Sequence, residues 1–180
     1  MARRKGRIIR FEDWERRFNK GLPLCDMKPS LKCHRIGELY YFSFFRRTKS
    51  GKPFTEIKQS ADDTAVFSSQ AVYFLRKLVL NLDGWCIVTT PRRRSGEGMH
   101  FASEVCSRIA DEIGIPFYDN AVCCVNRKRI EPDFILLRPI PERRVIVFDD
   151  IITTGSTLKA TVESLGERDI IVNLIGINNR

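Results

Sequence analysis

Apolar residues along this chain follow two spacings, and together they predict strands alternating with helices. Short apolar runs predict strands at residues 38–46, 85–90, 115–118, 145–148 and 170–177. Apolar positions three and four residues apart predict helices over residues 62–81 and 99–113. This alternation predicts a mostly parallel sheet with helices on both faces, which is a doubly wound α/β fold.

The other segments are less regular. Residues 1–10 form a basic arm, residues 11–18 predict a short helix, and residues 21–33 hold two prolines and predict a loop. Residues 120–144 are polar with three prolines, and they predict a strand pair with a mobile cover. The cover would include Arg127, Lys128 and Arg129. The predicted division is a basic N-terminal extension at residues 1–37 and one domain at residues 38–180.

Length and composition are those of one globular domain, with 180 residues and 43% hydrophobic content. No apolar run approaches the roughly 20 residues needed to span a bilayer, so no membrane partner is expected. The N-terminus lacks the apolar core of a secretory signal, and we expect a cytoplasmic protein. The six cysteines show no disulfide framework, and Cys86 and Cys106 have the apolar neighbours of reduced core residues.

The net charge of +9 is concentrated in the first third of the chain. Residues 1–58 contain 16 lysines and arginines against 6 aspartates and glutamates, whereas residues 59–180 contain 15 against 16. This asymmetry favours an anionic partner, nucleic acid or protein, for the basic N-terminus. The alternative is a solvated tail with no partner.

Residues 145–157, VIVFDDIITTGST, contain the most informative pattern. Four apolar residues predict a buried strand, and Asp149 and Asp150 follow at its carboxyl end. A small-residue turn comes next, and a helix is predicted from Leu158 to Leu165. The turn comprises Thr153, Thr154, Gly155, Ser156 and Thr157.

Such a turn places hydroxyls and backbone N–H groups at a helix N-terminus, where a phosphate is favoured. The two carboxylates, one strand end away, can accept hydrogen bonds from sugar hydroxyls. Each part alone also fits a capping or turn role. The ordered combination favours a site for a phosphorylated sugar.

A second loop follows the predicted strand at residues 85–90. It contains Thr90, Pro91 and three arginines, Arg92, Arg93 and Arg94. Ligands of open parallel sheets bind beyond the carboxyl ends of the strands. If the two strands are neighbours, these arginines face the same cleft as the carboxylates, and guanidinium groups suit a multi-oxygen phosphate. The alternative is a solvated basic loop.

Residues 145–157 resemble the 5-phosphoribosyl-1-pyrophosphate (PRPP) signature of type I phosphoribosyltransferases. Residues 87–117, IVTTPRRRSGEGMHFASEVCSRIADEIGIPF, are similar to the corresponding stretch of ComF-like, competence-associated members. The resemblance covers roughly residues 57–177. It implies the type I phosphoribosyltransferase fold with a small hood, and a transferase in nucleotide metabolism that moves a phosphoribosyl group to a nitrogenous base.

The resemblance also implies residue roles. Asp149 and Asp150 would be the catalytic pair that holds the ribose hydroxyls, directly or through Mg²⁺ and water. Residues Thr153 to Thr157 would bind the 5′-phosphate, and residues Thr90 to Arg94 would form the pyrophosphate loop. Mg²⁺ would be the cofactor, held mainly by the substrate, with no firm protein ligand set. For a general base, Asp150 is the first candidate and His100 the weaker one.

This chain departs from the ComF-like pattern in two places. That group commonly carries an N-terminal zinc module with C-x-x-C pairs, whereas this chain offers only Cys25, Cys33 and His34, without that spacing. Residues 120–144 do not resemble a base-recognition element, so the acceptor, a nucleobase or amine, stays unassigned.

Three functional classes remain at this point. The first is a PRPP-dependent enzyme, a pentosyltransferase, for which a homodimer is expected. The second is a non-catalytic module that senses PRPP or a nucleotide and binds nucleic acid through its basic arm, in a competence, mobile-element or defence role. Residues 40–45 would stack bases in that module, although core packing is the simpler explanation of these aromatics. The third is a scaffold within a larger assembly.

Overall fold

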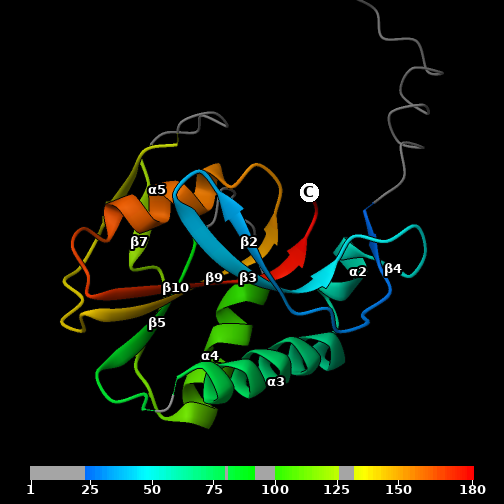
Figure 1. Ribbon diagram of the computed structural model, residues 1–180, viewed down its shortest axis with the longest axis horizontal. Helices are drawn as coiled ribbons and strands as arrows, with labels where there is room; N and C mark the ends of the chain where they lie inside the picture. Colours follow the sequence, from blue (N-terminus) through cyan, green and yellow to red (C-terminus); the bar gives the residue numbers. More distant parts are fainter. Residues whose placement is uncertain (1–22, 80, 92–99, 126–131) are drawn as a thin grey trace, which may run out of the picture.

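The computed structural model describes residues 23–79, 81–91, 100–125 and 132–180, and they form three layers (Figure 1). The middle layer is a six-stranded sheet in the order β2-β3-β10-β9-β5-β6. Strands β3, β10, β9, β5 and β6 are parallel, and β2 is antiparallel to β3 at one edge. The strands are β2 Lys32–Ile36, β3 Leu39–Arg46, β5 Trp85–Thr89, β6 Phe117–Tyr118, β9 Arg144–Ile152 and β10 Ile170–Asn178.

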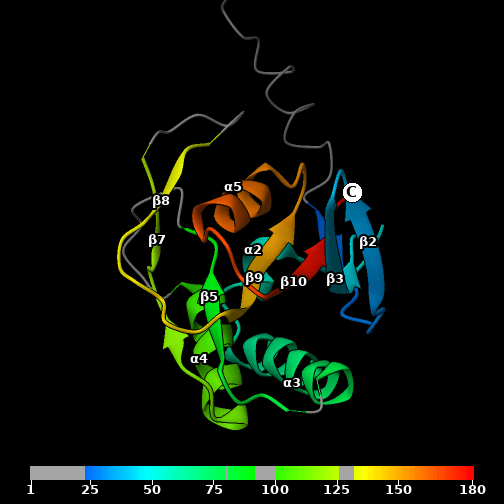
Figure 2. The same ribbon diagram turned by 60° about the vertical axis from the view of Figure 1, so that its left-hand side comes forward.

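The outer layers cover opposite faces of the sheet, as Figures 1 and 2 show. Helices α3 (Ala61–Leu78) and α4 (Phe101–Ile113) cover one face. Helix α5 (Ser156–Ser164) and the antiparallel pair β7 (Val122–Cys124) and β8 (Phe134–Leu136) cover the other. The predicted doubly wound, mostly parallel α/β fold is therefore confirmed.

Side chains along β9 alternate between the two faces of the sheet, so this one strand contributes to two hydrophobic cores. Ile146 and Phe148 are buried in the core shared with α3 and α4. Val145 and Val147 are buried in the core shared with α5. Because successive strand residues point to opposite faces, an uninterrupted apolar run is what a central strand buried on both sides requires.

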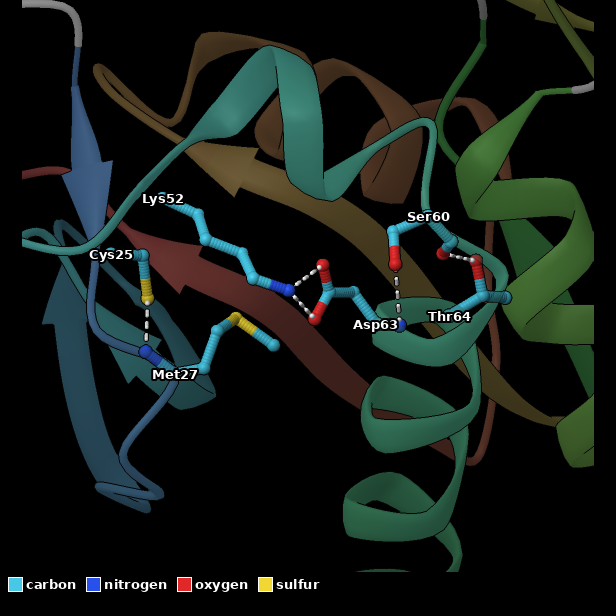
Figure 3. A network of polar contacts seen from close by, with 6 residues as sticks. All are labelled: Cys25, Met27, Lys52, Ser60, Asp63 and Thr64. Atoms are coloured by element: carbon cyan, nitrogen blue, oxygen red, sulfur yellow. Dashed lines mark hydrogen bonds and ion pairs between the residues drawn. The ribbon is translucent and has the colours of Figure 1, made fainter.

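A small unit, which we call the hood, lies beside the start of α3. It consists of β1 (Leu24–Cys25), β4 (Lys52–Pro53) and the short helix α2 (Phe54–Ile57). Figure 3 shows how it is fastened: Lys52 Nζ donates to both carboxylate oxygens of Asp63, at 3.0 and 2.9 Å. Ser60 caps α3 by accepting the backbone N–H of Asp63 at 3.1 Å. Asp63 thus joins the hood to the helix start.

The N-terminal part of the described chain is more regular than predicted. Residues 21–33, predicted as a loop, contain β1 and the start of β2. The predicted domain boundary after residue 37 falls in the turn between the paired strands β2 and β3, where Gly37 has a φ of 58°. Residues 1–22, with the predicted basic arm and the helix at 11–18, lie outside the described residues.

Residues 120–144 contain the predicted strand pair, β7 and β8. Arg127, Lys128 and Arg129 of the predicted cover lie outside the described residues. Among the described helices, none has both the length and the apolar character needed to cross a bilayer. Most of the aromatic run at residues 40–45 belongs to the core, because Tyr41, Phe44 and Phe45 are buried while Tyr40 is exposed.

The cysteines of the described residues are free thiols, and Cys25, Cys86 and Cys106 are buried. His34 stacks on Tyr41, with its Nε2 2.9 Å from Ser43 Oγ. Within the described ranges, no group of three histidine, cysteine or acidic residues is placed to hold a metal ion. The described structure therefore gives no support to a zinc site built on Cys25, Cys33 and His34.

Candidate functional site

Asp149 and Asp150 lie within β9, not beyond its end. The strand continues to Ile152 because β10 pairs with it along this whole stretch, with Ile175 opposite Asp149 and Asn178 opposite Ile152. The prediction that the strand ends at Phe148 was therefore wrong. The partner strand β5 reaches only Thr89, which lies opposite Phe148. The two carboxylates thus extend past β5, at the carboxyl edge of the sheet.

Asp149 is buried and bonds to the segment that follows β5. Thr90, itself buried, donates its hydroxyl to Asp149 Oδ1 at 2.9 Å. Burial and the neighbouring charge of Asp150 raise the pKa of Asp149 to about 7, while the Thr90 hydrogen bond and the charge of Lys58 oppose this rise. Asp149 is therefore only partly ionised at neutral pH.

Asp150 is less buried, and its carboxylate Oδ2 forms an ion pair with Lys58 Nζ. Lys58 is the residue that ends α2, so this cation belongs to the hood. Sequence reasoning did not find Lys58, because nothing in its local pattern marks it. Only the tertiary fold brings it to a carboxylate 92 positions further along the chain.

The turn after β9 leads directly into α5. Thr153 and Thr154 are exposed, and Thr154 Oγ1 lies 3.0 Å from Ser156 Oγ. Gly155 precedes the helix with a φ of 83°, a left-handed conformation that favours glycine. The helix begins at Ser156, two residues earlier than predicted. Its first turn presents backbone N–H groups that have no acceptor within the helix.

The edge strand β2 supports this turn from the side. A Cβ atom on Gly155 would stand 2.6 Å from Cδ1 of Ile36, the last residue of β2. The side chain of Ile36 therefore fills the space beside the turn.

The structure brings most of the predicted site residues together. Strands β5 and β9 are neighbours, which is the condition for the loops after them to face the same cleft. The hydrogen bond between Thr90 and Asp149 joins Asp149 of β9 to the segment that follows β5. Arg92, Arg93 and Arg94 lie outside the described residues, so their predicted role stays a prediction. His100, the weaker base candidate, stands at the start of α4, where its Nδ1 is 3.0 Å from Ser103 Oγ.

We compared the chain with known protein families, sequences and solved structures. No protein-family model and no curated protein sequence matches the chain. Solved structures do match: adenine phosphoribosyltransferase from Saccharomyces cerevisiae, complexed with an imino-altritol bisphosphate and adenine, superposes with a TM-score of 0.51. The identity is 14%, over 82% of this chain and 84% of that chain.

This chain has the type I phosphoribosyltransferase fold. Two other matches have lower TM-scores. Purine phosphoribosyltransferase from Pyrococcus horikoshii has a TM-score of 0.40 and 17% identity, over 63% of this chain and 81% of that chain. Hypoxanthine phosphoribosyltransferase from Trypanosoma cruzi has a TM-score of 0.42 and 14% identity, over 70% of this chain and 64% of that chain. At these identities the likeness concerns the type I phosphoribosyltransferase fold alone.

Proposed function

We propose that this protein is a cytoplasmic, Mg²⁺-dependent phosphoribosyltransferase of the ComF-like kind. It binds PRPP and transfers the phosphoribosyl group to a nitrogenous base. The observation that carries the proposal is the position of the acidic pair. Asp149 and Asp150 stand at the carboxyl edge of the sheet, and only Ile151 and Ile152 separate them from the turn that opens α5. Parallel α/β sheets bind their ligands at this edge.

Each part of the substrate has a matching group in the chain. The carboxylates of Asp149 and Asp150 accept hydrogen bonds from the ribose hydroxyls. The hydroxyls and backbone N–H groups of residues 153–157 bind the 5′-phosphate at the helix N-terminus. The segment from Thr90 to Arg94 receives the pyrophosphate, and its first residue already bonds to Asp149.

The reaction forms one bond and breaks one. A nitrogen of the acceptor attacks C1 of the ribose, and the bond from C1 to the pyrophosphate oxygen breaks with its electron pair on the oxygen. The nitrogen then loses a proton, for which Asp150 is the candidate acceptor. Because positive charge develops on the ribose, the fixed carboxylates and phosphate-binding groups contribute by positioning and electrostatics.

The donor set near the ribose site suits Mg²⁺. Magnesium prefers oxygen ligands and takes few of them from protein, and two adjacent carboxylates satisfy that preference. Asp149 and Asp150 would hold the ion together with substrate oxygens. Its contribution, when bound, is to neutralise the negative charge of the leaving pyrophosphate.

Calorimetric titration of PRPP with Mg²⁺ tests the proposal. We expect binding by the unmutated protein and none by the Asp149→Asn, Asp150→Asn double variant, with circular dichroism confirming that both are folded. Asp150→Asn alone should abolish pyrophosphate release when nucleobases are screened as acceptors. Binding that is absent from the unmutated protein, or equal in both proteins, would overturn the proposal.

A further inference from the structure

The ion pair between Lys58 and Asp150 places a cation of the hood on a carboxylate that the proposed function assigns to ribose. Lys58 occupies Oδ2 of Asp150. A sugar hydroxyl that donates to this oxygen therefore competes with Lys58 for it, whereas Oδ1 can accept other donors. The ammonium group carries three N–H donors on a flexible stem, so it can turn to another acceptor nearby.

The position of Lys58 indicates which acceptor that is. Lys58 follows α2, and the α2 residues Phe54 and Ile57 are buried in the core shared with α3 and α4. Helix α5, whose N-terminus is the proposed 5′-phosphate site, covers the opposite face of the sheet. The two phosphate groups of PRPP leave the ribose from opposite ends, at C5 and at C1. If the 5′-phosphate binds at the start of α5, as proposed, a cation on the α3 side lies towards the C1 end of the ribose.

The hood contains a second lysine ion pair, which serves as an internal comparison. Lys52 donates to both oxygens of Asp63, a buried residue at the start of α3. That pair joins two parts of the fold. Lys58 instead meets Asp150, one member of an adjacent pair of carboxylates at the sheet edge. At that edge one cation, Lys58, faces two acidic groups. Lys58 can therefore exchange Asp150 for another acceptor.

We propose that Lys58 is a substrate-binding residue that leaves Asp150 when PRPP binds and donates to the diphosphate group at C1. The inference rests on the proposed function. The exchange makes the hood part of the binding site, because its own residue contacts the substrate. It also selects ligands, since a sugar phosphate without a diphosphate gains nothing from the released ammonium.

Two ligands that differ only at C1 test this role. PRPP and ribose 5-phosphate are titrated, each with Mg²⁺, into the unmutated protein and into the Lys58→Met, Lys58→Arg and Lys52→Met variants. For Lys58→Met we expect PRPP affinity to fall about tenfold or more, the usual effect of losing a charge-assisted hydrogen bond. Ribose 5-phosphate affinity should stay the same or increase, because Asp150 no longer has to release a lysine.

The two other variants separate charge from folding. Lys58→Arg should retain most of the PRPP affinity, and Lys52→Met should bind both ligands as the unmutated protein does. A second readout needs no ligand: carboxyl carbon NMR should show a higher pKa for Asp149 in Lys58→Met, because the Lys58 charge lowers it in the unmutated protein.

The outcomes are distinct. Equal losses for both ligands, or unchanged PRPP affinity in Lys58→Met, would overturn the role of Lys58 and leave the proposed function in place. No PRPP binding by the unmutated protein would overturn the proposed function, and the role of Lys58 with it.

Discussion

Two buried aspartates of this protein have very different surroundings. Asp63 receives Lys52 on both of its oxygens, and the Ser60 cap binds its backbone. Asp149 receives one hydroxyl, from Thr90, and stands beside a second carboxylate. Partners on a buried carboxylate offset the cost of taking its charge out of water, whereas a neighbouring like charge adds to that cost. Functional sites are where such costs are commonly found.

Substituting one of these two aspartates tests the difference between them. The largest expected effect is on the pH dependence of the free energy of unfolding, through Asp149. The pKa of Asp149 is about 7 in the folded protein, against an ordinary value of 3.8. Between about pH 4 and pH 7 the folded state therefore holds a proton that the unfolded state has lost, and stability falls as the pH rises. The decline through this group amounts to at most about 4 kcal/mol.

Asp149→Asn should remove that decline, because asparagine keeps an acceptor for Thr90 and carries no charge. We expect the variant to gain stability relative to the unmutated protein as the pH increases from 5 to 8, while it loses PRPP binding. Urea unfolding at several pH values measures the difference. Parallel pH profiles for the two proteins would show that Asp149 titrates normally.

A smaller effect is expected at the other aspartate. Asp63→Ala leaves Lys52 without its partner and removes a buried acceptor, at a cost of about 1–3 kcal/mol. The exposed neighbour Asp62 lies in the same first turn of α3 and is the matched control, because Asp62→Ala changes the helix charge but no ion pair described here. Chemical denaturation checks both, and PRPP affinity should be unchanged in both. Equal destabilisation by the two substitutions would refute a special role for the Lys52–Asp63 pair.

The smallest effect concerns the turn before α5. Gly155→Ala places a side chain at a φ of 83° and against the flexible end of Ile36, which should cost about 1 kcal/mol or slightly more. Gly37→Ala is the control: Gly37 also has a positive φ, but an added Cβ there meets nothing within 4 Å. Thermal unfolding should show similar costs, whereas only Gly155→Ala should weaken ribose 5-phosphate binding. Equal affinities in the two variants would argue against phosphate binding at this turn.

Local sequence patterns were sufficient to predict much of the fold and the order of the elements that surround the candidate site. Residues 145–157 gave strand, acidic pair, turn and helix in the right order, because each depends on neighbours in sequence. The end of β9 was misplaced because carboxylates are unusual in a buried strand. It is pairing with β10, distant in sequence, that keeps Asp149 and Asp150 extended.

Features that depend on tertiary contacts could not be predicted. Lys58 has no local signature, and its contact with Asp150 follows from the packing of the hood. The strand β2 was missed because Pro23 and Pro29 indicated a loop, although Gly37 between two apolar residues, Ile36 and Leu39, was an available hairpin signal. The arginines at 92–94 remain a prediction from sequence.

The order of strands has a consequence for biosynthesis. Strand β3 lies between β2 and β10, with Phe42 opposite Leu174, so its parallel partner is translated more than a hundred residues later. Until then the edge of β3 that pairs with β10 stays open, although α3 can already pack on the β3 residues Phe42, Phe44 and Phe45. Contacts this distant in sequence form slowly and leave apolar surface exposed meanwhile. A nascent chain of this protein is therefore expected to need protection by chaperones until β10 has left the ribosome.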